Sequence, residues 1–168
     1  VAVGRVTMQK NYSVLIDAAH ILAEQGDAPD ITVLGGSDLT DEQEKLENKL
    51  RDLGDVKLNF AGLKTRSGVL QELDENALYV NCSIHEGMSN AVLEAIQKGI
   101  PVIVSDIESN RDLDLGDEFY FDPHNPQMLA NKIKDALANP EKYIVDPKKF
   151  NDWDGTIDEI LKVTGVIL

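Results

Sequence analysis

The segment HEGMSNAVLEA, residues 85–95, joins the two kinds of secondary structure from which this chain is built. Before it, Asn76 to Ser83 is an apolar run that predicts a buried strand. After it begins, Ser89 to Lys98 has the apolar spacing of an amphipathic helix. Glu86 and Gly87 therefore lie in the loop at the carboxyl end of the strand, which is where open α/β sheets bind their ligands.

This short segment also carries chemistry that suits a phosphorylated sugar. The start of a helix offers unpaired backbone N–H groups and a partial positive charge, and both favour a bound phosphate. Glu94 lies more than one turn inside the helix and can accept a hydrogen bond from a sugar hydroxyl. Because Glu86 is on the loop and Glu94 on the helix, the two acids suit different hydroxyls of one ligand better than they suit one proton shuttle.

The rest of the chain alternates predicted strands with predicted helices. The expected strands are residues 1–3, 31–34, 56–60, 76–83 and 102–104, with an edge strand at 119–121. The expected helices are capped by or begin near Asn11, Thr40, Val69, Ser89, Glu108 and Pro126, and a last one covers residues 152–163. Five or six short strands, each followed by a helix, predict an α/β fold with a doubly wound, Rossmann-like parallel sheet and right-handed crossovers.

Local signals predict where three of these helices begin or end. Asn11 is expected to cap the first one. Thr40 and Gln43 have the spacing of a capping box before the second, and Gly54 is placed to end it. Gly99-Ile100-Pro101 is expected to break the helix that follows the central segment.

Composition excludes several classes of protein. The chain has 168 residues, of which 42% are hydrophobic and 27% charged, as in ordinary globular domains. Its net charge of −14 argues against nucleic acid as a partner, because binding to the phosphate backbone requires clustered Lys and Arg. No apolar run is long enough for a transmembrane segment. The one cysteine, Cys82, lies in an apolar strand and is expected to be a buried, inert thiol, which makes the cytoplasm the default compartment.

A metal site has little support in this sequence. The chain has three His and one Cys and carries no H-x-x-x-H or C-x-x-C pattern. His85 beside the glycine turn is interpreted as an exposed or supporting residue. The acidic stretch from Asp112 to Asp117 is interpreted as a solvated loop.

A second constellation follows the first predicted strand. The loop GRVTMQKN, residues 4–11, carries Arg5 and Lys10 at the same end of the sheet as Glu86. Arg presents a planar fork to phosphate oxygens and Lys adds a mobile point charge, so the pair can hold a diphosphate without a metal. The loop has neither G-x-G-x-x-G nor G-x-x-x-x-G-K-[ST], which removes the main support for a nicotinamide site or a P-loop.

Five motifs in order resemble one family of enzymes. They are GRVTMQKN at residues 4–11, LGG at 34–36, NFAGL at 59–63, the Glu-x7-Glu segment HEGMSNAVLE at 85–94 and KGIPVIVSD at 98–106. Together they look like the carboxyl-terminal, donor-binding half of retaining glycosyltransferases of family 4 (group 1), which have the two-domain GT-B fold.

This resemblance implies a nucleotide-diphosphate sugar, such as a UDP-sugar, as the donor, no cofactor, no metal and transfer of a hexosyl group. It implies that Glu86 lies by the transferred sugar, where it can stabilise charge at the anomeric carbon. Glu94 would accept hydrogen bonds from the ribose. The donor phosphates would be bound by Arg5, Lys10 and the turn Met88, Ser89, Asn90 and Ala91. The residues bordering the nucleobase would be Gly35, Gly36, Gly62, Leu63 and Lys64.

The resemblance also implies that a partner domain is missing. Such enzymes place their acceptor site on an amino-terminal domain, so the chain is expected to be one donor-binding domain, residues 1–168, that transfers nothing alone. Residues 1–150 would form the α/β core and residues 151–168 a helix that crosses to the missing domain. The full enzyme could still associate with a membrane surface. Glu108 to Asp112 departs from the family pattern, in which a Gly-rich stretch and a Glu are common.

Two other functions remain open at this point. A nucleotide-sugar epimerase of related fold would share the phosphate cradle, although the Arg5 and Lys10 spacing favours the transferase. A non-catalytic nucleotide-binding or receiver-like module would fit the size. A receiver domain, however, needs acids where this chain has Gly4-Arg5 and Ala61-Gly62.

Overall fold

The computed structural model describes residues 1–37, 40–87 and 89–150, and the predicted helix at 152–163 lies outside them. Six strands form two parallel three-stranded sheets of order β1-β2-β3 and β4-β5-β6. The strands are β1 (Ala2–Val3), β2 (Ile31–Leu34), β3 (Leu58–Gly62), β4 (Tyr79–Asn81), β5 (Val102–Ser105) and β6 (Tyr120–Phe121). The predicted α/β class, with parallel strands and intervening helices, is confirmed.

The two sheets meet at β1 and β4. The backbone N–H of Val80 donates to the carbonyl of Val1 at 2.9 Å, and the amino group of Val1 donates to the carbonyl of Leu78 at 2.6 Å. Across this seam the strand order is 3-2-1-4-5-6, the order of a doubly wound sheet. The chain leaves β1 in one direction and β4 in the other, so the seam is the topological switch point.

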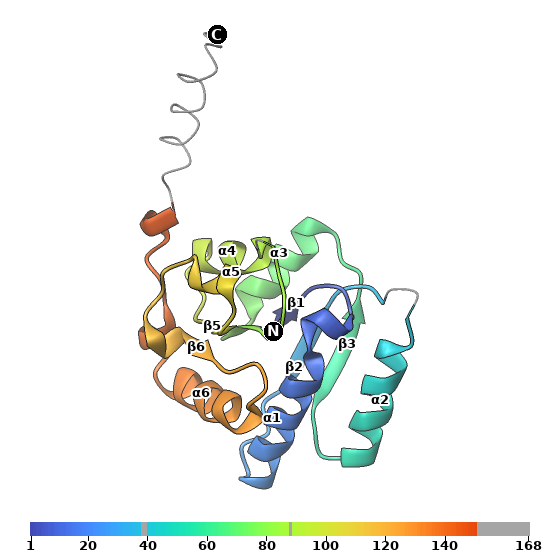
Figure 1. Ribbon diagram of the computed structural model, residues 1–168. Coiled ribbons are helices and arrows are strands. Elements are labelled where there is room, and N and C mark those ends of the chain that lie inside the picture. Colours follow the sequence, from blue (N-terminus) through green and yellow to red (C-terminus); the bar gives the residue numbers. More distant parts are fainter. Residues whose placement is uncertain (38–39, 88, 151–168) are drawn as a thin grey trace.

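Helices cover the strands on both sides. Figure 1 shows α1, α2 and α6 on one side of the strands and α3, α4 and α5 on the other. Their bounds are α1 (Tyr12–Glu24), α2 (Glu42–Leu53), α3 (Arg66–Glu75), α4 (Asn90–Gln97), α5 (Glu108–Arg111) and α6 (Pro126–Ala138). Short 3-10 turns are η1 (Met8–Lys10), η2 (Asp117–Phe119), η3 (Pro140–Tyr143) and η4 (Pro147–Phe150).

One apolar core fills the space between these layers. The β-branched run Val102 to Val104 is fully buried, as a strand covered on both faces requires. On α1, Leu15 and Leu22 are each 1% exposed and face the core from one stripe of the helix. Burial of one such Leu or Ile side chain contributes about 1.5–3 kcal/mol. The core therefore fixes the ends of β1 and β4, from which the two polar loops emerge.

Of two predicted caps, one is confirmed in position and the other is wrong. Asn11 is the N-cap residue of α1, as predicted, but it has a left-handed φ of 51°, its side chain makes no capping bond, and its amide donates to the carbonyl of Pro123 at 2.8 Å. It therefore holds the loop between β6 and α6. The N-cap of α2 is Asp41, and the Gln43 side chain reaches forward to Glu47 at 2.7 Å instead of completing a box with Thr40.

Three predicted boundaries also shift, and strand pairing or capping explains each. β3 begins at Leu58, not at residue 56, because Leu58 pairs with Ile31, the first residue of β2. β4 spans only Tyr79–Asn81, the three residues that pair with Val102–Val104 of β5. α3 begins at Arg66 because the Thr65 hydroxyl caps it by accepting from the Gly68 N–H at 3.2 Å. Gly54 ends α2 as predicted, with a φ of 74°.

Candidate functional site

Lys10 and Glu86 meet at the switch point. Lys10 ends η1 after β1, Glu86 lies in the loop after β4, and their ammonium and carboxylate groups form an ion pair. The two side chains are only 21% and 13% exposed. The structure thus joins a residue predicted to bind phosphate with the residue predicted to face the sugar, across 76 positions of sequence.

Two further hydrogen bonds hold this loop. The Ser83 hydroxyl donates to the Glu86 carboxylate at 2.6 Å, and the Ile84 N–H donates to the carbonyl of Gln9 at 2.9 Å. Burial raises the pKa of Glu86, but the bonds from Lys10 and Ser83 outweigh it, so the net pKa lies below the ordinary value. Glu86 is therefore a fixed, ionised carboxylate at neutral pH.

Gly4 provides the space in which Lys10 lies. A Cβ atom on Gly4 would stand 2.6 Å from Cε of Lys10, and the φ of +149° is one that other residues rarely adopt. The Gly4 carbonyl accepts from the Tyr12 hydroxyl at 3.0 Å, which fixes the turn. The backbone conformation after β1 thus favours glycine at this position, and the absence of a side chain leaves room for the lysine.

A buried polar network supports the Glu86 loop from below. Ser105 donates from its hydroxyl to the carbonyl of Ser83 at 2.6 Å. The Asn110 amide donates to the Ser105 carbonyl at 2.8 Å and to the Asn81 side chain at 3.3 Å. The Asn81 amide in turn donates to the Ser89 hydroxyl at 3.2 Å. The network links the ends of β4 and β5 to the starts of α4 and α5, and the sequence signal for it is polar residues inside otherwise apolar strands.

The predicted phosphate cradle lies beside this network. Ser89 is the N-cap of α4, and Asn90 and Ala91 are its first residues. The Ser89 side chain makes no capping bond to the helix. The first turn of α4 therefore keeps its N–H groups directed beyond the helix start, as a phosphate site requires. Met88, the fourth predicted member, lies outside the described residues.

Arg5 stands apart from the Lys10–Glu86 pair. Its side chain is exposed, and it has no ion-pair partner among the residues that the structure describes. The structure thus places Arg5 on the same loop as Lys10 but does not bring its guanidinium to Glu86. The guanidinium is free to meet an anion.

Glu94 has a different neighbour. Its carboxylate pairs with Nη2 of Arg66 at 3.1 Å, and the Arg66 side chain is 81% exposed. A surface hollow of about 480 Å³ is lined by Arg66, Asn90, Leu93, Glu94 and Gln97. Sequence reasoning missed Arg66, because it belongs to α3 and its predicted position was a loop.

The residues predicted to border a nucleobase lie on two loops that are bonded to each other. Gly35 donates to the carbonyl of Gly62 at 2.9 Å, and Val6 donates to the carbonyl of Gly36 at 3.0 Å. A Cβ on Gly35 would lie 1.9 Å from the carbonyl oxygen of Gly4. The close passage of the β1 loop thus already requires glycine at position 35, and the role of Gly35 beside a nucleobase stays a prediction. Leu63 is 84% exposed, and Lys64 pairs with Glu72 at 3.6 Å.

A second hollow opens beside Glu86. It has a volume of about 490 Å³ and is lined by Ile84, His85, Glu86, Gly87, Ile107, Glu108, Ser109 and Asp112. One wall is the loop after β4 and the other is the start of α5, which follows β5. The hollow is therefore at the carboxyl end of the strands, next to the switch point.

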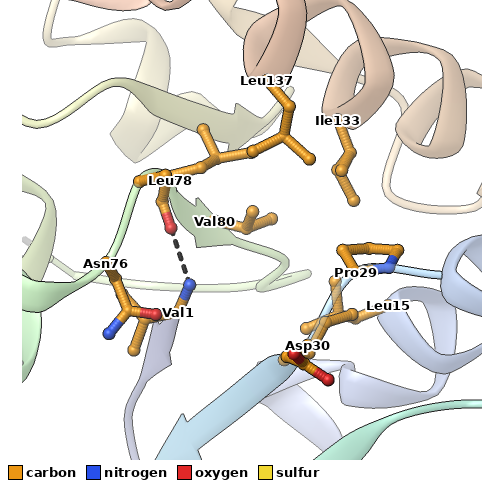
Figure 2. A pocket seen from close by; sticks show the side chains of 11 residues that line it. Val1, Leu15, Pro29, Asp30, Asn76, Leu78, Val80, Ile133 and Leu137 are labelled. Carbon is orange, nitrogen blue, oxygen red and sulfur yellow. Dashed lines mark hydrogen bonds between the residues drawn. The ribbon is translucent and has the colours of Figure 1, made fainter. Parts of the chain in front are cut away.

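The amino end of the strands is closed by apolar side chains instead. Figure 2 shows Leu15, Val80, Ile133 and Leu137 around a cavity beside Val1. Its volume is about 80 Å³, and its lining includes residues from β2, β4, α1 and α6. Because its lining is mainly apolar and it lies opposite to the ligand end of the sheet, it is interpreted as a packing gap of the core.

Other predicted features can be placed as well. Cys82 is 2% exposed, and burial raises its pKa to about 12, so the prediction of a buried inert thiol is confirmed. Within residues 1–37, 40–87 and 89–150, no group of three His, Cys, Asp or Glu side chains is placed to hold a metal. In the same ranges, none of the helices has the length and hydropathy to cross a membrane.

Comparison with known sequences found a matching family model and several similar proteins. The family model described as "Glycosyl transferases group 1" matches residues 1–151. The chain is 30% identical over 113 residues to the amylovoran biosynthesis glycosyltransferase AmsK of Erwinia amylovora, covering 62% of this chain and 27% of that protein. It is 28% identical over 110 residues to mannosylfructose-phosphate synthase of Agrobacterium fabrum, covering 62% and 24%. The chain thus spans about a quarter of the length of the curated relatives it matches.

Comparison with solved structures found proteins with a similar fold. The catalytic domain of cholesterol-alpha-glucosyltransferase from Helicobacter pylori superposes with a TM-score of 0.72 at 28% identity, covering 89% of this chain and 93% of that one. HepE from Anabaena, solved with UDP and glucose, superposes with a TM-score of 0.74 at 21% identity, covering 88% and 41%. The second likeness concerns the fold alone.

Proposed function

The chain belongs to the group 1 glycosyl transferases, and on that premise we propose that it is the donor-binding, carboxyl-terminal domain of a retaining family 4 enzyme. Its ligand would be a UDP-sugar or another nucleotide-diphosphate sugar, from which the whole enzyme transfers a hexosyl group to an acceptor. The observation that carries the proposal is the Lys10–Glu86 ion pair at the switch point of the sheet. It supports a site at which a phosphate-binding cation and a sugar-facing acid act on one ligand.

The phosphates would lie between the β1 loop and the start of α4. Lys10 is already held within reach of Glu86, and Arg5 is exposed on the same loop. A diphosphate carries more charge than one carboxylate, so it competes for the Lys10 ammonium while Arg5 adds its planar fork. The N–H groups of Asn90 and Ala91 complete the cradle.

The two acids would hold the hydroxyl groups at either side of the diphosphate. Glu86, fixed by Ser83 and kept ionised, would stabilise positive charge that develops at the anomeric carbon as the diphosphate leaves. Glu94 would exchange its ion pair with Arg66 for the ribose hydroxyls. The acceptor would attack from the same face of the sugar, in a site completed by an acceptor domain, so this domain alone would bind nucleotide without transferring sugar.

Calorimetric titration of the folded chain with UDP, GDP and ADP tests the proposal. We expect at least one of them to bind, with a dissociation constant at or below about 1 mM (about −4 kcal/mol). The variant Lys10→Met should weaken that binding by at least about tenfold, because a charge-assisted hydrogen bond to phosphate is lost. The variant Lys45→Met, which removes an exposed cation on α2, should bind like the wild type. If none of the three nucleotides binds to folded protein, the proposed site is wrong.

A further inference from the structure

The side chains that line the hollow beside Glu86 carry a net negative charge. Among its lining residues are three acids, Glu86, Glu108 and Asp112, and no Lys or Arg. Glu86 is neutralised by Lys10, which approaches it from the β1 loop. Within the part of the chain that the structure describes, Glu108 and Asp112 form no ion pair. Two carboxylates, one at the first residue of α5 and one just after its last residue, thus line this hollow without a cationic partner among the described residues.

The nearest cation on α5 is not available to these carboxylates. Arg111 donates to both carboxylate oxygens of Asp106, at 2.6 and 2.7 Å, and to Asp117 at 2.7 Å. Its guanidinium lies over the ring of Tyr120, 4.0 Å from the ring centroid. These contacts raise its pKa and hold it in place. The negative charge of the hollow is therefore a stable property of the fold.

Resting on the proposed function, we infer that this hollow takes an uncharged hexose and rejects a uronic acid, and that Glu108 is the main determinant of this selectivity. A neutral sugar can donate its hydroxyl protons to Glu86, Glu108 and Asp112, since ionised carboxylates are acceptors only. A uronate would place a further carboxylate among them, and like charges at close range disfavour binding. Glu108 begins α5 on one wall of the hollow, opposite the Glu86 loop on the other.

Uncharged polar side chains also line this hollow, and they suit a ligand that is rich in hydroxyl groups. Ser109 lines the same hollow, and its buried hydroxyl has no hydrogen-bond partner among the described residues. His85 adds one more polar group on the opposite wall. The hollow thus offers acceptors and neutral donors, but no cation that could pair with a sugar carboxylate.

The test compares two donors that differ in one group. The affinities of the folded chain for UDP-glucose, UDP-glucuronate and UDP are measured by calorimetry at low salt, where screening is weak. We expect UDP-glucose to bind at least about tenfold more tightly than UDP-glucuronate, which is about 1.4 kcal/mol. The variant Glu108→Gln should narrow this ratio by about threefold or more and leave the affinity for UDP unchanged. The variant Glu44→Gln, on the distant α2, should leave the ratio unchanged.

The outcomes separate this inference from the proposed function. Equal affinities for UDP-glucose and UDP-glucuronate, with UDP still bound, would overturn the inference and leave the nucleotide site standing. An unchanged ratio in Glu108→Gln would also overturn it, provided that circular dichroism shows the variant folded. Loss of all binding, UDP included, would count against the proposed function itself.

Discussion

Glu86 and Glu94 lie in one short segment, yet their ion pairs are of different kinds. Their own exposures are similar, at 13% and 20%, whereas the partner Lys10 is 21% exposed and the partner Arg66 is 81% exposed. Lys10 packs against Gly4 and faces an acid that also accepts from Ser83. Arg66 must give up side-chain freedom and hydration to stay at Glu94. The solvent access of the partner, not of the acid, therefore separates a strongly held ion pair from a weakly held one.

Removal of Lys10 should have the largest effect on stability. In Lys10→Met the ionised Glu86 keeps the hydrogen bond from Ser83 but is left largely buried without its Lys10 counter-charge. We expect the free energy of unfolding to fall by about 2–3 kcal/mol, below the value for a fully buried pair because both groups retain some water. Urea denaturation followed by circular dichroism measures it, with Lys45→Met as the control that should change stability by less than about 0.5 kcal/mol. Equal losses of unfolding free energy in Lys10→Met and Lys45→Met would show that the Lys10–Glu86 pair stabilises the fold no more than an exposed pair does.

Loss of Asn110 should come next. Its amide is 1% exposed and donates to Ser105 and Asn81, so Asn110→Ala leaves two buried acceptors short of a donor. The expected loss is about 2 kcal/mol. If the network also positions Glu86, affinity for UDP-glucose should fall further than affinity for UDP. Asn131→Ala, at an exposed position of α6, is the matched control for both measurements.

The pH dependence of stability tests the Glu86 environment. The folded-state pKa of Glu86 lies below its ordinary value of about 4.5, so its pair contributes fully above that pH and the contribution is lost as pH falls through the folded pKa. Asp41, Asp106 and Asp135 also have lowered pKa values and act in the same direction. The difference in unfolding free energy between wild type and Glu86→Gln should therefore shrink as pH falls from 6 to about 3. A constant difference over that range would show that the ion pair does not stabilise the fold.

Removal of Arg66 should have the smallest effect. An exposed partner contributes little, so Arg66→Ala should change the free energy of unfolding by less than about 0.5 kcal/mol. Affinity for UDP should stay within about threefold of the wild type, or rise as Glu94 is released to the ribose. A loss of stability comparable to that of Lys10→Met would show that the two pairs are alike.

Much of the fold was predictable because its signals are local. The apolar run at Val102 to Val104 predicted β5 closely, and the glycine after Leu53 predicted the end of α2. Each signal acts only on residues near it in the sequence. The bounds of β3 and β4 were not predicted closely, since they depend on which residues pair with a neighbouring strand. The capping bonds were not predictable either, because the Asn11 side chain bonds to Pro123 in a distant segment and Gln43 bonds to Glu47 within its own helix.

The sequence predicted which residues belong to the candidate site, but not which of them contact each other. That Lys10 and Glu86 lie at one end of the sheet follows from the parallel strands, whereas their contact depends on β1 and β4 being neighbours, which no local pattern encodes. Arg66 was missed because its relation to Glu94 is between helices. The polar network at Asn81 and Asn110 was missed because a polar residue in a strand does not reveal its partner.

The seam between β1 and β4 gives the molecule an order of assembly. Within each half-sheet, neighbouring strands are joined by one helix and its loops, whereas the seam brings together Val1 and Leu78, 77 positions apart. Closing longer loops costs more entropy, and non-local pairing slows folding, so the two halves can form before they join. Lys10 belongs to one half and Glu86 to the other. Their ion pair therefore forms only when the two half-sheets dock. Formation of the complete site is thus a late step of folding.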